Sequence, residues 1–163
     1  KHTLNTDFSG INCDVVIGDA KRITQMCLNL LSNAVKYTGD GGSIFFSIAE
    51  RGAHREKEEA DTVYMEYEMV VEDNGIGISE EFIPHLFEPF ERDKKVHSGT
   101  IPGTGLGMPI ARNLARLMGG EVYVKSVENE GTRFDVTFRL KLPDTNEDIK
   151  PDENEISDGI VKF

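Results

Sequence analysis

An apolar stripe with helical spacing runs through residues 20–37 and constrains the fold more than any other feature. Apolar side chains recur there every three or four positions, which is typical of a helix that packs one face against a hydrophobic core. Asp19 is suited to cap the start of this helix, and the glycine-rich run at residues 38–42 ends it. The helix needs a second layer to cover its stripe, which consists of Ile23, Met26, Cys27, Leu30, Leu31 and Ala34.

Polar side chains occupy the opposite face of the same helix. Asn29 and Asn33 lie four positions apart and Lys36 follows one turn later, so the three side chains share one face. Packing against a core explains the apolar stripe but leaves this polar face unexplained. We therefore interpret the face as a surface that holds a charged ligand.

Turn-forming residues divide the rest of the chain into short segments. The connector at residues 50–61 is highly charged, which predicts a solvated hairpin loop, whereas the polar segment 89–105 has the length of a functional lid. Pro109 is tolerated only in a first helical turn, so the last helix should begin near residues 107 and 108. The order of the segments predicts an α/β layer architecture. We expect strands at residues 3–8, 13–17, 43–49, 63–72, 121–127 and 132–140, and helices at 20–37, 79–87 and 107–118.

The length and charge of the chain limit its class. Its 163 residues are enough for one domain, which we place at residues 1–142. We expect an acidic, disordered linker at 143–163 towards a further domain. A net charge of −11 disfavours nucleic acids and anionic membranes as partners, because both bind clustered lysine and arginine. Cys13 and Cys27 lack the neighbours of a zinc or redox site, so we expect free thiols in a reducing cytoplasm. No apolar run reaches the roughly 18 residues of a membrane span.

A glycine-containing motif, Asp73-Asn74-Gly75-Ile76-Gly77, directly follows a predicted strand. A tight turn explains it in structural terms, because Asn-Gly and Gly positions accommodate positive φ angles. In the functional interpretation, the glycines let the backbone approach a flat ligand while Asp73 accepts a hydrogen bond from an exocyclic amine such as that of adenine. An ionised carboxylate only accepts hydrogen bonds, so it suits an amine and repels a keto oxygen.

A second glycine-rich motif, Gly103-Thr104-Gly105-Leu106-Gly107, opens the last predicted helix. Glycine-rich turns at helix N-termini bind phosphates through free backbone N–H groups and the helix dipole. The spacing differs from the dinucleotide-binding fingerprint, and the chain has no Gly-Lys pair of a P-loop. The motif alone therefore indicates an anion site without identifying the ligand.

The two asparagines, the two glycine motifs and an intervening Phe87-Glu88-Pro89-Phe90 segment occur in one characteristic order. They resemble the N, G1, F and G2 boxes of the catalytic, ATP-binding domain of bacterial sensor histidine kinases. That domain belongs to the wider GHKL family, with gyrase, the MutL mismatch-repair proteins and the ninety-kilodalton heat-shock chaperone. The resemblance covers residues 3–141. It implies a two-layer α/β sandwich of the Bergerat type, with a mixed, mostly antiparallel sheet and helices on one face.

The resemblance also implies a Mg-ATP site. Asn33 would ligate Mg²⁺ through its side-chain oxygen, with Asn29 beside the metal and the phosphates. Lys36 and Arg92 would neutralise phosphate charge, and with Asn29 they would be the catalytic residues; the alternative for Arg92 is a solvated surface arginine. Tyr37 would lie against the nucleotide or simply pack. The implied site comprises Asn29, Asn33, Lys36, Tyr37, Asp73, Gly75, Gly77, Ile78, Arg92, Gly103, Thr104, Gly105, Leu106, Gly107, Met108 and Thr132.

The activity implied by the resemblance is transfer of the γ-phosphoryl group of ATP to a histidine of a separate dimerisation domain, as in two-component signal transduction. None of His2, His54, His85 and His97 has the phosphoacceptor motif, so we expect that domain, and a response regulator or receiver domain, to lie outside this chain. The alternatives are a GHKL-type ATPase and a non-catalytic nucleotide-binding module. Hydrolytic relatives have a glutamate at the position of Asn29 as general base, and an amide lacks useful basicity, which favours transfer. We expect a cytoplasmic domain of a parent that can be membrane-anchored.

Overall fold

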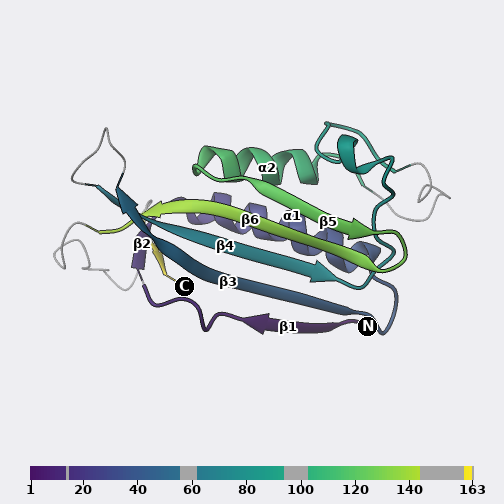
Figure 1. Ribbon diagram of the computed structural model, residues 1–163, viewed down its shortest axis with the longest axis horizontal. Coiled ribbons are helices and arrows are strands. Elements are labelled where there is room, and N and C mark those ends of the chain that lie inside the picture. The colour runs from purple at the N-terminus through teal and green to yellow at the C-terminus, as the bar shows by residue number, and fades with distance from the viewer. Residues whose placement is uncertain (14, 56–61, 94–102, 144–159, 163) are drawn as a thin grey trace.

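The computed structural model describes residues 1–13, 15–55, 62–93, 103–143 and 160–162. The strands are β1 (Thr3–Asp7), β2 (Val15–Ile17), β3 (Ser43–Arg55), β4 (Val63–Asp73), β5 (Val122–Val127), β6 (Gly131–Lys141) and β7 (Ile160–Lys162), and the helices are α1 (Ala20–Tyr37), the 3-10 turn η1 (Ile83–His85) and α2 (Gly107–Leu117). They form one seven-stranded sheet in the order β1-β3-β4-β6-β2-β7, with β5 also paired to β6 (Figure 1). Among the strands that the structure describes, only β1 and β3 run parallel, so the mixed, mostly antiparallel sheet is confirmed.

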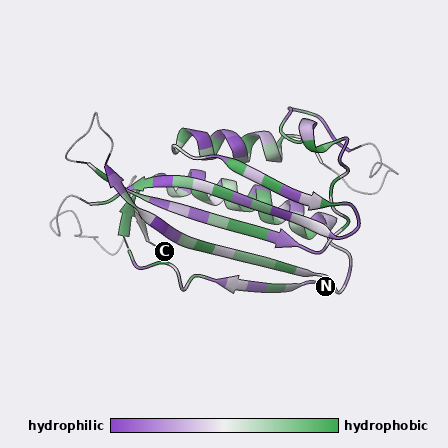
Figure 2. Cartoon of the chain, viewed as in Figure 1, coloured by the Kyte–Doolittle hydropathy of each residue, from purple (hydrophilic) through white to green (hydrophobic). Residues whose placement is uncertain are grey.

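Both α-helices lie on one face of the sheet and pack against each other, so the core lies between two layers (Figure 1). Four residues of the predicted stripe of α1 are buried, and Met26 and Leu30 have no exposed surface. Cys27 and Leu31 are half-buried and pack against the core. β6 alternates between buried and partly exposed residues, as expected for a strand with one face on the core. Figure 2 shows hydrophobic and hydrophilic residues as alternating bands along the strands. Tyr67 of β4 and Phe138 of β6 stack on the inner face, with 5.6 Å between their ring centroids.

Both ends of α1 lie where the sequence predicts them. The Asp19 carboxylate accepts a hydrogen bond from the Arg22 N–H at 3.1 Å and so caps the N-terminus. At the C-terminus, the Tyr37 carbonyl accepts the Ile76 N–H at 3.1 Å. This bond joins the end of α1 to the loop that follows β4. It brings the polar face of α1 next to the Asp73–Gly77 motif.

The hairpin loop predicted at residues 50–61 is wrong in its first half. β3 continues through Arg55, because the first half of β4 supplies hydrogen-bonding partners for it, with Ala53 opposite Met65. A bulge near Gly52 absorbs one extra residue and lets the charged sequence stay in the sheet. Residues 56–61 lie outside the described part of the chain.

The helix predicted at residues 79–87 is reduced to the single turn η1. Pro84 explains the difference, because proline has no N–H to donate to a carbonyl four residues earlier. α2 begins at Gly107, which confirms the start inferred from Pro109. Of the predicted lid, residues 94–102 are not among those described.

The last described segment is the short strand β7, which pairs antiparallel with β2 at the edge of the sheet. Residues 144–159 are not described, so the linker proposed at 143–163 stays a prediction. Within the described ranges, no helix is both long enough and apolar enough to cross a bilayer.

Candidate functional site

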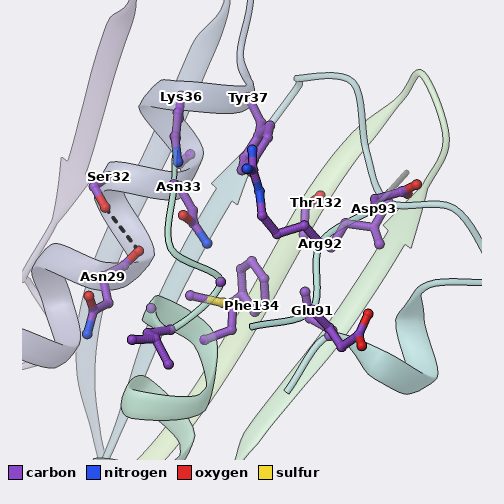
Figure 3. Close-up of a pocket in the computed structure, with 18 of the residues that line it drawn as sticks. Asn29, Ser32, Asn33, Lys36, Tyr37, Glu91, Arg92, Asp93, Thr132 and Phe134 are labelled. Atoms are coloured by element: carbon purple, nitrogen blue, oxygen red, sulfur yellow. Dashed lines mark hydrogen bonds between the residues drawn. The ribbon is translucent and has the colours of Figure 1, made fainter. Parts of the chain in front are cut away.

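A cavity of about 470 Å³ lies between α1, the loop after β4, residues 91–93 and the start of α2, with β6 behind it (Figure 3). Every residue of the predicted site except Gly75 lines this cavity. The fold therefore gathers three motifs that are far apart in the sequence, the asparagine face of α1 and the two glycine motifs, together with Arg92 and Thr132. The lining residues that the sequence motifs did not indicate are Ser32, Ala34, Phe82, Leu86, Glu91, Asp93, Ile110 and Phe134.

The wall formed by α1 presents amide groups to the cavity. The Asn29 Nδ2 atom is buried and has no hydrogen-bond partner in the described structure. Gly107, at the start of α2, lies close to the Asn29 side chain. A Cβ at Gly107 would lie 3.6 Å from Asn29 Oδ1. Buried polar groups in native proteins are almost always hydrogen-bonded, so this amide is suited to a ligand that enters between α1 and α2.

Two cationic side chains converge on the cavity from different elements. Lys36 extends from α1 and Arg92 reaches towards Tyr37 from the opposite side (Figure 3). Burial and the nearby charge of Arg92 lower the pKa of Lys36. Lys36 has no ion pair with any carboxylate that the structure describes. Because the two cations repel each other, an anion bound between them would be stabilised.

A buried carboxylate also lines the cavity. Asp73 is the last residue of β4 and lies opposite Thr132 of β6. It is only 9% exposed. The Gly75 N–H donates to Asp73 Oδ1 at 2.9 Å. Burial nevertheless raises the pKa of the Asp73 carboxyl. The group can accept a further hydrogen bond from a ligand amine.

Gly75 was predicted to line the site, and the structure assigns it a supporting position. Its amide holds Asp73, and a Cβ on it would lie 2.3 Å from the Tyr37 carbonyl oxygen. Only glycine lets the two backbones approach this closely. Gly75 therefore acts on the site through packing and through the orientation of the Asp73 carboxylate.

Ser126 of β5 is a supporting residue for which we found no sequence signal. Its hydroxyl donates to the Gly131 carbonyl at 2.9 Å, lies 2.9 Å from Thr132 Oγ1 and accepts the Ile78 N–H at 2.8 Å. Gly77 has a φ of +68° and a Cβ on it would lie 2.1 Å from the Val127 carbonyl oxygen. These contacts fix the loop after β4 against the β5–β6 turn.

The second glycine motif forms the remaining wall. The first N–H groups of a helix have no intrahelical partner, and in α2 these include the N–H groups of Gly107 and Met108. Leu106, which precedes α2, makes no side-chain cap for them. Gly105 has a φ of +72°, and its carbonyl accepts the Phe90 N–H at 3.1 Å. The cavity thus combines helix N-terminal N–H groups and two cations with a carboxylate acceptor. This arrangement suits a polyanion attached to an amine-bearing base.

The sequence matches the model of a protein family described as histidine kinase-, DNA gyrase B-, and HSP90-like ATPase, over residues 18–144. The chain belongs to this ATPase family. The matched range contains all the motifs that line the cavity. The resemblance to the catalytic domain of sensor histidine kinases is confirmed by this match and by the relatives of the chain.

Two relatives are histidine kinases much longer than this chain. Hybrid signal transduction histidine kinase B of Dictyostelium discoideum is 37% identical over 131 residues, which cover 80% of this chain and 6% of that protein. Sensor histidine kinase WalK of Bacillus subtilis (strain 168) is 35% identical over 130 residues, which cover 80% of this chain and 19% of that protein. The chain thus spans only a small part of the length of these relatives.

The fold of this ATPase family member is also found in a solved structure, the mycobacterial sensor histidine kinase MprB. The two superpose with a TM-score of 0.65 and cover 87% of this chain and 85% of that one. Their sequences are 23% identical, so this comparison shows the fold alone. It confirms the predicted α/β sandwich with helices on one side of the sheet.

Proposed function

We propose that this chain binds Mg-ATP in the cavity and transfers its γ-phosphoryl group to a histidine of a separate dimerisation domain. The observation that carries the proposal is the position of Asn29. Its buried amide lies against the start of α2, on the same wall as Lys36. An amide can hold a phosphate there but cannot act as a base for water. Relatives of the matched region are named histidine kinases, which supports transfer over hydrolysis.

The adenine base belongs at the end of the cavity formed by Asp73 and Thr132. The Asp73 carboxylate would accept a hydrogen bond from the adenine amine, and the backbone of Gly77 lines the same part of the cavity. Apolar side chains of Ile78 and Met108 line the same cavity and would cover the ring faces. Tyr37 would lie beside the nucleotide.

The triphosphate belongs at the other end, beside Lys36, Arg92 and the start of α2. The N–H groups of Gly107 and Met108, at the uncapped N-terminus of α2, would donate to the phosphates. Mg²⁺ fits the donor set, because the side-chain oxygen of Asn33 is a hard ligand and the Asn29 amide is buried without a partner. When bound, the ion would neutralise charge on the phosphates.

The chain's residues would act mainly by position and charge. In the transfer, the bond between the γ-phosphorus and its bridging oxygen breaks, and a bond forms from phosphorus to a ring nitrogen of the acceptor histidine. Negative charge grows on the leaving oxygen, where Lys36, Arg92 and the α2 N–H groups stabilise it. Asn29 leaves a nearby water without a base, so ATP is kept for the histidine.

The same proposal includes partners and a cellular location. The acceptor histidine would lie on a dimerisation domain of the parent kinase, and a response regulator or receiver domain would take the phosphoryl group next. The relative from Dictyostelium is a hybrid kinase, which is compatible with a receiver domain in the same protein. We expect this domain to act in the cytoplasm, without direct contact to membrane or nucleic acid.

The test is phosphoryl transfer in trans. The chain is mixed with the histidine-containing domain of its parent protein and with γ-labelled ATP and Mg²⁺. We expect label on the histidine domain in an acid-labile, base-stable form, and its loss in Asn33→Ala. Asn113→Ala is the matched control, because Asn113 is also on a helix but is exposed and outside the cavity.

Two outcomes would contradict the kinase proposal. Release of labelled phosphate without a labelled protein would identify an ATPase. ATP binding with neither transfer nor hydrolysis would identify a nucleotide-binding module.

A further inference from the structure

The acidic residue next to Arg92 is bound to a buried hydroxyl. Ser79 Oγ donates a hydrogen bond to Asp93 Oδ2 at 2.8 Å, and the Ser79 N–H faces the same oxygen at 3.4 Å. Ser79 is only 3% exposed. A hydrogen bond to a carboxylate is stronger than one between neutral groups, so this contact holds residue 93 at a fixed place on the protein.

The contact bears on the direction of the Arg92 side chain. Figure 3 shows Arg92 reaching across the cavity towards Tyr37, while the Asp93 side chain turns the other way. Neighbouring side chains on an irregular, extended segment point in different directions, so fixing one of them limits where the other can point. Holding Asp93 on one side therefore keeps Arg92 directed at Lys36 and the phosphate end.

Ser79 also belongs to the part of the protein that forms the base end of the cavity. It follows Ile78, whose N–H donates to Ser126 Oγ at 2.8 Å. Ser126 Oγ in turn lies 2.9 Å from Thr132 Oγ1, and Thr132 is paired with Asp73. Hydrogen bonds, together with the peptide bond between Ile78 and Ser79, thus connect the base end to the residue beside Arg92.

We propose that Ser79 and Asp93 are positioning residues that direct Arg92 at the terminal phosphate of the nucleotide. The pair would give the site its preference for a triphosphate over a diphosphate without touching the ligand itself. This inference rests on the proposed function, because it assumes that the cavity binds ATP. Neither residue belongs to the sequence motifs that indicated the site.

The test compares the affinity of the chain for Mg-AMPPNP with its affinity for Mg-ADP by titration calorimetry. The ratio of the two affinities reports contacts to the terminal phosphate. We expect Ser79→Ala to lower the ratio about tenfold, which corresponds to about 1.4 kcal/mol. Arg92→Ala should lower it at least as far, and adding Ser79→Ala to Arg92→Ala should lower it no further. Asp93→Asn should fall between wild type and Ser79→Ala, because its amide oxygen still accepts a hydrogen bond.

Ser9→Ala is the matched control for Ser79→Ala. Ser9 Oγ also donates to an aspartate, Asp7 Oδ1, at 2.7 Å, but the pair is exposed and outside the cavity. Its affinity ratio should equal that of wild type. If Ser79→Ala fails to fold by circular dichroism, Asp93→Ala provides the same comparison at a partly exposed position.

The outcomes separate this inference from the proposed function. If Arg92→Ala lowers the ratio but neither Ser79→Ala nor Asp93→Ala does, the positioning role is wrong and ATP binding stands. If Arg92→Ala itself leaves the ratio unchanged, Arg92 does not contact the terminal phosphate and the inference is overturned. If wild type binds neither nucleotide, the proposed function fails and the inference fails with it.

Discussion

Gly103→Ala tests the contribution of Lys36 to nucleotide binding without changing Lys36 itself. A Cβ at Gly103 would lie 2.5 Å from Lys36 Nζ and 3.8 Å from Lys36 Cε. Only the flexible end of the lysine is in the way. We therefore expect the ammonium group to move by about 1 Å, to an ordinary contact distance of about 3.5 Å, while the fold is unchanged.

The size of the effect follows from Coulomb's law. A cation that moves from about 3 Å to about 4 Å from a phosphate charge loses about 1.4 kcal/mol at an effective dielectric constant of about 20. That loss corresponds to an affinity about tenfold lower. Unlike the loss expected at Ser79, it should affect ADP and ATP alike if Lys36 lies beside the phosphates that the two nucleotides share.

The assay is titration calorimetry with Mg-ADP, with thermal unfolding as a check on the fold. Gly39→Ala is the matched control, because a Cβ at Gly39 would meet nothing within 4 Å. In a Lys36→Ala background, Gly103→Ala should have no further effect on affinity. An unchanged affinity of the single variant, or an equal loss in the Lys36→Ala background, would refute the reasoning.

Three further predictions concern two carboxylates. ATP should bind at least about tenfold more tightly than GTP, because the Asp73 carboxylate accepts from an amine and repels a keto oxygen, and Asp73→Asn should reduce that preference; equal affinities by calorimetry would contradict the assignment. Burial raises the pKa of Asp73, so on acidification this carboxylate should become protonated at a higher pH than an exposed aspartate. ATP binding should weaken over the same pH range. Asp73→Asn should remove this pH dependence. Burial opposes the charged form of Glu121, but hydrogen bonds from Arg112 and Arg116 prevail and lower its pKa to about 2. Its stabilisation, ~1 kcal/mol for a partly exposed network, should be present above the ordinary glutamate pKa and be lost as the pH falls towards about 2. Urea unfolding of wild type and Glu121→Gln should therefore converge at low pH, and a constant difference would exclude this role.

The helix α1 could be predicted from the sequence because its signals are local. The cap at Asp19 and the apolar stripe are set by neighbouring residues, and both are present in the structure. The cavity could also be anticipated, because each motif places polar or glycine residues at the end of one element. How these ends converge followed from the family resemblance and not from periodicity.

Contacts between distant segments could not be predicted in this way. Ser126 and Ile78 are separated by 48 positions, and Ser79 and Asp93 by 14, so no local pattern pairs them. The extension of β3 to Arg55 depends on a partner strand rather than on its own charged sequence. Strand propensity is a weak guide where pairing supplies the backbone hydrogen bonds.

The junction between the end of α1 and the loop after β4 has a consequence for ligands that fill only the base end. Tyr37 and Ile76 are joined by a backbone hydrogen bond, and the carbonyl of Tyr37 packs directly on Gly75. The Asp73 carboxylate is thus held in place before any ligand arrives. A small, flat, amine-bearing compound would find this wall preorganised, so little conformational entropy would be lost in ordering it. Such a compound could bind efficiently for its size without any contact to the phosphate end.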